Sequence, residues 1–167
     1  MILRALTLAG GMAGAAAVSQ FPEFSQQYVQ RLGGAVDALA EVVADFDASA
    51  AAVGLSREDA LAQLRGSEFL ERRRADMTRT MARHATLKRD LAEIEGAGPF
   101  MRAYHLPHLS DTDVAQAAWA AYQPALPLNF AGALFGGFGF VAGLMGVGLI
   151  LRLLAWPFRR QRGSMGA

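Results

Sequence analysis

The chain contains no cysteine among its 167 residues. Disulfide frameworks, thiolate metal sites and cysteine nucleophiles are therefore excluded, because each of them requires a cysteine sulfur. An excess of positive charge is also missing, since 16 Lys and Arg against 15 Asp and Glu leave a net charge of +1. Proteins that bind nucleic acid need surplus basic residues to replace counterions along the phosphates, so no nucleic-acid partner is expected.

Apolar residues, in contrast, make up 53% of the chain and are concentrated at its two ends. Residues 130–151 include no charged side chain, and as an α-helix this run is roughly 33 Å long, enough to cross the hydrocarbon core of a bilayer. Asn129 is suited to cap such a helix. The sequence thus predicts a second transmembrane helix within residues 127–155, followed by a basic cytoplasmic tail over residues 156–167.

The apolar segment at the other end, residues 1–19, is shorter and rich in Gly and Ala. One interpretation is a first transmembrane helix, which would be stabilised by packing against a neighbouring helix. The alternative is a signal peptide, with Arg4 as its basic start and Ala15–Ala17 as a small-residue cleavage site. The spacing of the small residues favours the retained helix.

Small residues recur at steps of three and four in both apolar segments, which places them on one face of each helix. Facing stripes of small residues let two backbones approach closely, and van der Waals packing then holds helices together in lipid. The partner helix could belong to the same chain or to a second copy. The predicted helix-packing residues are Gly10 and Gly14 in the first segment and Gly132, Gly136, Gly139, Gly143 and Gly146 in the second.

Basic residues flank the outer ends of the two apolar segments, whereas the inner flanks carry few of them. Because Lys and Arg beside a span remain on the cytoplasmic side, both termini are expected in the cytoplasm. The region between the spans, residues 20–126, would then be periplasmic in a bacterial inner membrane protein. The residues that set this topology or mark the interface are Arg4, Arg152, Trp156, Arg159, Arg160 and Arg162.

Residues 20–126 are predicted to be helical throughout, because Ala, Leu, Arg and Glu dominate and no alternating β-branched run occurs. A long helix should run from Pro22 to Gly54 and bend or loosen at Gly33–Gly34. Ser56 and Ser67 are suited to cap the two following helices, and Ser110–Asp113 the last. The expected fold class is all-α, with two transmembrane helices flanking an extramembrane antiparallel helical hairpin or bundle.

The two long helices of this hairpin are expected to pack through apolar stripes and to match charges across the contact. The basic run that begins at Arg72–Arg74 and includes Arg79 and Arg83 would face acidic residues of the other helix. The alternative is a basic face that contacts anionic lipid headgroups or an acidic patch of a partner. The stripe predicted for the first long helix consists of Phe24, Tyr28, Leu32, Ala35, Leu39, Val42, Phe46 and Ala50.

Three histidines are the nearest approach to a chemical site. His105 and His108 are close in sequence, but Pro107 argues against a shared helical face, and His84 lies far away in the chain. No nucleophile motif, phosphate loop or zinc-protease helix is present. We therefore expect no enzyme activity, no catalytic residue, no cofactor-binding residue and no metal ligand, and keep a His-based metalloprotein as an alternative.

Five short segments carry a resemblance to a known family. They are Leu8–Gly14, Ser19–Phe24, Arg31–Gly34, Asp45–Asp47 and Trp156–Arg159. With them the chain resembles a bacterial membrane family known as domain of unknown function 2937 over nearly its whole length. The family has no assigned activity, so the resemblance implies a retained two-span protein and transfers no site residue.

Together these features predict an integral inner-membrane protein without chemistry of its own, which serves as a structural or interaction subunit, or scaffold, of an envelope complex. The expected partners are the lipid bilayer and either another membrane protein or a second copy of the chain. A lipid- or small-molecule-binding membrane module, with a cavity in the hairpin, is the other alternative.

Overall fold

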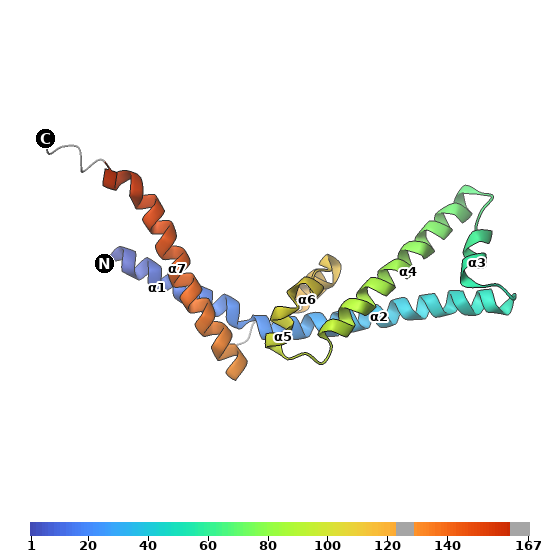
Figure 1. Cartoon of the computed structure of the whole chain (residues 1–167), viewed down its shortest axis with the longest axis horizontal. Coiled ribbons are helices and arrows are strands. Elements are labelled where there is room, and N and C mark those ends of the chain that lie inside the picture. The colour runs from blue at the N-terminus through green and yellow to red at the C-terminus, as the bar shows by residue number, and fades with distance from the viewer. Residues whose placement is uncertain (123–128, 161–167) are drawn as a thin grey trace. The chain divides into compact units, whose positions relative to one another are not determined.

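The computed structural model describes residues 1–122 and 129–160, and every regular element in these ranges is helical (Figure 1). The all-α prediction is therefore confirmed. Two compact units form: residues 1–24 with 129–160, and residues 25–122. The elements are α1 (Ile2–Ser19), α2 (Phe21–Ala52), α3 (Arg57–Gln63), α4 (Glu68–Ile94), α5 (Pro99–Tyr104), the 3₁₀ helix η1 (Leu106–His108), α6 (Thr112–Ala121) and α7 (Phe130–Arg160).

Two helical stretches are long and apolar enough to cross a membrane, one within Ile2–Ala52 and one over Phe130–Leu154. Their most apolar windows have mean hydropathies of 1.4 and 2.1, and only 6% of each window is buried. A core helix of a soluble protein would bury most of such a window inside the chain. The apolar side chains of these windows instead face outward, as they do in helices surrounded by lipid.

Polar side chains cap the helix starts as the sequence predicts. Ser56 Oγ accepts a hydrogen bond of 3.1 Å from the backbone N–H of Asp59, and Ser67 Oγ one of 3.3 Å from Leu70. Asn129 Oδ1 accepts a bond of 2.7 Å from the N–H of Gly132. Each cap satisfies a backbone donor that has no partner within the helix, so these residues define where α3, α4 and α7 begin.

Helix α2 continues through Gly33–Gly34 without interruption, so the two glycines do not end it. The helical hydrogen bonds use the backbone alone, so two glycines weaken a long helix by about 1 kcal/mol each without ending it. A Cβ at either position would meet nothing within 4 Å. Neither glycine is therefore needed for a close contact with any residue that the structure describes.

The core of the unit over residues 25–122 is formed by apolar side chains from α2, α4 and α6. Its most buried members are Tyr28, Leu32, Leu87, Ile94 and Ala118. The stripe predicted for α2 needs correction at two positions, because Val36 and Val43 are buried whereas Val42 is 44% exposed and Ala35 is only partly buried. The buried face continues from Leu32 to Val36, four residues on, whereas the predicted stripe continued to Ala35, three residues on. This difference rotates the buried face away from the predicted stripe at the following positions.

In the part of the chain that the structure describes, no basic residue of α4 forms an ion pair with α2, which corrects another prediction. Within the described ranges, Arg72 pairs with Glu68 and Arg79 with Asp76, both inside α4. Such neighbours at three and four residues are on the same helix face and need no second element to be ordered. Figure 1 shows that the two long helices diverge toward α3, so the part of α4 nearest α3 lies away from α2.

Candidate functional site in the apolar helix pair

Four glycines bring the backbones of α1 and α7 into close contact. A Cβ placed on Gly139 would lie 2.9 Å from the carbonyl carbon of Gly14, and one on Gly143 would lie 2.9 Å from that of Gly10. Real Cβ atoms do not occur at such distances from backbone. The contact is therefore open to glycine alone, and each helix contributes two glycines that are four residues apart, as in the packing of many membrane helices.

The other predicted packing glycines lie elsewhere. A Cβ on Gly136 would make an ordinary contact of 3.5 Å with the Cβ of Ser19, whereas one on Gly146 would meet nothing within 4 Å. Gly132 is buried in the first turn of α7, where its N–H bonds to Asn129. The contact within the chain thus uses Gly10, Gly14, Gly139 and Gly143 and leaves Gly146 on an open face.

Gly11 belongs to the contact but was not predicted. It is buried, and a Cβ there would lie 2.8 Å from the ring of Phe140 and 2.9 Å from Leu144 Cγ. The adjacent pair Gly10–Gly11 was the feature of the sequence that could have predicted this role, because two neighbouring glycines leave a broader area of the helix surface without side chains than one glycine does. Large side chains of α7 fit against that surface.

The order of contacts shows that the two helices are antiparallel. Thr7 lies near Gly148 and Ser19 near Gly136, so positions rise along α1 as they fall along α7. At the Ser19 end, the rings of Phe21 and Phe135 pack with their centroids 5.2 Å apart. The N-terminal end of α1 is thus paired with the C-terminal half of α7.

At that N-terminal end an open groove of about 650 Å³ runs between α1 and α7. Arg4 and Arg152 line it together with apolar side chains, and neither arginine forms an ion pair with any residue in the described ranges. Trp156, Arg159 and Arg160 lie in the last turns of α7, and Arg162 lies outside the described residues. The groove is lined by Leu3, Arg4, Thr7, Leu8, Leu144, Gly148, Leu151 and Arg152.

Titratable groups of the unit over residues 25–122 act mainly as structural links. The buried Tyr28 hydroxyl accepts a 3.1 Å hydrogen bond from the N–H of Asp111, and burial raises the pKa of this phenol. Hydrogen bonds from Arg57 lower the pKa of the exposed Asp47 carboxyl. Arg83 bonds to Asp111 at 3.2 Å. These contacts tie α6 to α2 and α4, and α3 to α2.

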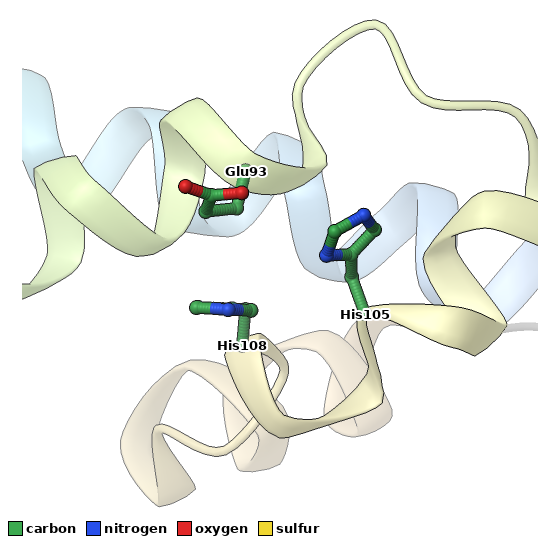
Figure 2. Close-up of side chains that lie close together, drawn as sticks. All are labelled: Glu93, His105 and His108. Atoms are coloured by element: carbon green, nitrogen blue, oxygen red, sulfur yellow. The ribbon is translucent and has the colours of Figure 1, made fainter.

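The histidines are arranged differently from the prediction. The rings of His105 and His108 have centroids 6.0 Å apart, and Glu93 at the end of α4 joins them (Figure 2). His84 is not part of this group. Pro107 does not separate the pair, because residues 106–108 form a 3₁₀ turn in which residues three apart share a face. The sequence argument that Pro107 opposes a shared helical face for His105 and His108 was therefore wrong.

One protein family matches the chain. Its description reads "Protein of unknown function (DUF2937)", and its model matches residues 2–160, which include both apolar helices and the unit between them. No curated protein and no solved structure matches.

Proposed function

We propose that this chain, which belongs to the family DUF2937 of proteins of unknown function, is a two-span inner-membrane protein that acts as a non-catalytic scaffold in an envelope complex. In this proposal α1 and α7 form one helix pair in lipid. The unit over residues 25–122 is presented to partners on the periplasmic side. The observation that carries the proposal is the glycine contact between two helices whose remaining surfaces are apolar and exposed.

A contact of this kind suits a lipid environment. Apolar side chains gain nothing by leaving lipid for one another, so a helix pair in a bilayer depends on close backbone packing. Gly10 and Gly14 against Gly139 and Gly143 supply that packing. Large side chains such as Leu8, Phe138 and Met145 are more than half exposed on the same helices, where they would contact acyl chains.

The basic groove supports the orientation. Arg4 and Arg152 line one end of the helix pair, and Arg159 and Arg160 follow in the last turns of α7. Arginines beside a span favour the cytoplasmic side, and long arginine side chains reach the headgroup layer from within the span. The end of the helix pair that carries these residues, formed by the start of α1 and the end of α7, therefore belongs at the cytoplasmic face.

The scaffold role rests on surface left uncovered in the unit over residues 25–122. Trp119 is 69% exposed and its ring stacks against that of Tyr122, with centroids 5.9 Å apart. Phe69 and Tyr104 are also largely exposed. Aromatic residues are enriched where proteins bind one another, so the exposed ring of Trp119 on α6 fits contact with another membrane protein or with a second copy of the chain.

Cysteine labelling tests the membrane topology, because the natural chain has no cysteine that would react. Single substitutions Ser49→Cys and Ser164→Cys would be treated with a membrane-impermeant maleimide in spheroplasts. We expect labelling at position 49 in intact spheroplasts and at position 164 only after the membrane is permeabilised. The reverse pattern, or recovery of the chain in the soluble fraction without detergent, contradicts the proposal.

Site-specific photo-crosslinking tests the scaffold role. A photoreactive amino acid would replace Trp119 in one strain and the exposed Ala44 in another, and both would be irradiated in intact membranes. We expect a discrete product from position 119 that is absent from position 44, with a mass that separates a self-dimer from a complex with another protein. Absence of any product specific to position 119 contradicts a partner surface on α6.

A second candidate function is binding of an anionic lipid, which the groove at Arg4 and Arg152 favours. Two guanidinium groups without a carboxylate partner in the described ranges suit a phosphate, and the leucines beside them suit an acyl chain. This groove lies between the apolar helices and not in the hairpin, where the sequence placed such a cavity. Native mass spectrometry with phosphatidylglycerol against phosphatidylcholine, on the natural chain and an R4Q/R152Q variant, separates specific binding from a general lipid annulus.

A further inference from the structure

We propose that Glu93, His105 and His108 bind one divalent transition-metal ion, for which zinc is the best fit. Each of the three residues offers one ligand atom, and these atoms lie within 4.8 Å of one another. Figure 2 shows the carboxylate of Glu93 and the two imidazole rings around a common space. The residues come from two segments, the last turn of α4 and the turn between α5 and α6.

The local fold explains why the two histidines come together. The backbone N–H of His108 donates a 2.9 Å hydrogen bond to the carbonyl oxygen of His105, which closes the 3₁₀ turn. Residues three apart in such a turn are eclipsed, so both rings project to one side. Pro107 suits this position because its fixed φ fits the first residues of a helix and no N–H is needed there.

Glu93 reaches the same space through a sharp reversal of the chain. Helix α4 ends at Ile94, and Gly96 has a φ of +72°, a conformation that glycine adopts readily. The chain then enters α5 at Pro99. This reversal brings the turn after α5 back beside the last turn of α4, where Glu93 is exposed on the helix surface.

The distances allow coordination after small side-chain movements. Ligands about 2.0–2.1 Å from a tetrahedral zinc lie about 3.4 Å from one another, so the widest pair of ligand atoms must close by roughly 1.4 Å. Glu93 is exposed and its carboxylate has no hydrogen-bond or ion-pair partner in the described ranges, so its side chain is free to rotate toward the two histidines.

A second carboxylate prepares His108 for a metal. Asp90 Oδ1 lies 3.0 Å from His108 Nδ1, and the Asp90 side chain is only 14% exposed. When this carboxylate accepts a hydrogen bond from Nδ1, the lone pair of the neutral imidazole is on Nε2, the nitrogen able to bind the ion. Metal-binding histidines commonly have such a carboxylate partner, which fixes the ring and increases its basicity.

The ligand set selects the class of metal. Two imidazoles and one carboxylate suit zinc and neighbouring transition ions, whereas calcium and magnesium prefer sites made of oxygen ligands alone. Three protein ligands leave a fourth position for water, and His105 and His108 are accessible enough for solvent to reach it. The bound ion would join the end of α4 to the turn at η1.

Metal titration of the full chain in detergent tests this site. The protein would be purified without a polyhistidine tag, treated with a chelator, and titrated with Zn²⁺ by calorimetry and with Co²⁺ by visible absorption. We expect one ion per chain. His105→Ala, His108→Ala and Glu93→Gln should each weaken zinc binding by at least about tenfold, and Asp90→Asn by about 10–100-fold, as for partners of metal ligands in other proteins.

His84→Ala is the matched control, because this partly buried histidine on α4 lies outside the group. It should leave the affinity unchanged. X-ray absorption of the zinc-loaded natural chain should show two imidazole ligands, and this measurement does not depend on whether a variant folds. Equal zinc binding by the natural chain and an H105A/H108A variant, or fewer than two imidazoles in the absorption spectrum, overturns the proposal.

Discussion

Replacing Gly139 with leucine should separate α1 from α7. The first added atom alone would lie 2.7 Å from the Cβ of Val18 and 2.9 Å from the carbonyl carbon of Gly14. Carbon atoms pack at about 3.5–4.0 Å, so the helices must move apart by about 1 Å at this level. The rest of the leucine side chain requires further room.

The size of the effect follows from the packing that is lost. A gap of about 1 Å forfeits up to about half of the attraction between the atoms it separates, and overpacked sites typically cost about 1–3 kcal/mol. Since each 1.4 kcal/mol is about a factor of ten in an equilibrium constant, we expect pairing of α1 with α7 to weaken by roughly 10- to 100-fold. Gly137→Leu is the control, because a Cβ at Gly137 meets nothing within 4 Å.

An engineered disulfide reports the pairing directly. The Cβ of Ser19 lies 3.5 Å from a Cβ built on Gly136, at the short end of the range of about 3.5–4.5 Å that disulfides require. A chain with S19C and G136C should therefore cross-link within itself under mild oxidation, and it contains no other cysteine. A polyethylene-glycol maleimide would then be reacted with the remaining free thiols. It adds mass only to chains without the disulfide, so a gel shows the cross-linked fraction.

Adding Gly139→Leu to this chain should reduce the rate of cross-linking at low oxidant by about the same factor as the pairing equilibrium. Adding Gly137→Leu should leave the rate unchanged. If Gly139→Leu cross-links as fast as the parent, or if both leucines slow the reaction equally, the glycine contact does not hold the two helices together.

Four further substitutions in the unit over residues 25–122 are tested by thermal unfolding of the full chain in detergent, followed by circular dichroism. Gly33→Ala should stabilise the folded chain by about 0.5–1 kcal/mol, because position 33 lies within a helix and has free space for a Cβ. Gly54→Ala should destabilise the folded chain by about 1 kcal/mol, because Gly54 has a φ of +73°. Ser67→Ala removes the cap of α4 and should cost about 1 kcal/mol, and an unchanged midpoint contradicts that role. Tyr28→Phe removes the hydroxyl bonded to Asp111 and should cost about 1 kcal/mol at neutral pH. Because burial raises the pKa of Tyr28 above the usual value near 10, the folded state holds this proton more tightly. The natural chain should thus lose stability as the pH rises above about 10, and the phenylalanine variant should lose less.

Local patterns in the sequence predicted the elements well. Ser56, Ser67 and Asn129 cap helices because the side-chain oxygen of each accepts a hydrogen bond from the backbone N–H three residues later. An interaction at such a short, fixed separation can be predicted from the sequence. The two apolar helices were likewise predicted from continuous composition. Contacts between elements were predicted less well. Ala35 and Val36 are both at helical spacing from Leu32, and this spacing alone does not decide which of them faces the core.

The group of Glu93 with His105 and His108 shows a second limit of local patterns. Two of its members are three residues apart, but their common face depends on a 3₁₀ turn that was not anticipated beside Pro107. The third member lies on another helix, and it reaches the histidines only because the chain reverses at Gly96. Spacing in the sequence predicts geometry within one helix, whereas this site depends on the chain folding back so that the turn at η1 lies beside the end of α4.

The two interpretations of residues 1–19 make different predictions for the glycine contact. If this segment were a signal peptide and were removed after Ala17, Gly139 and Gly143 would lose the backbone against which they pack and would instead expose a smooth face to lipid. A retained α1 keeps that contact, and it places Arg4 beside Arg152 at one end of the pair. We therefore expect the chain purified from membranes to retain residues 1–17. Intact-mass spectrometry measures this directly, and a mature chain that begins at Val18 would show that the contact does not form in the finished protein.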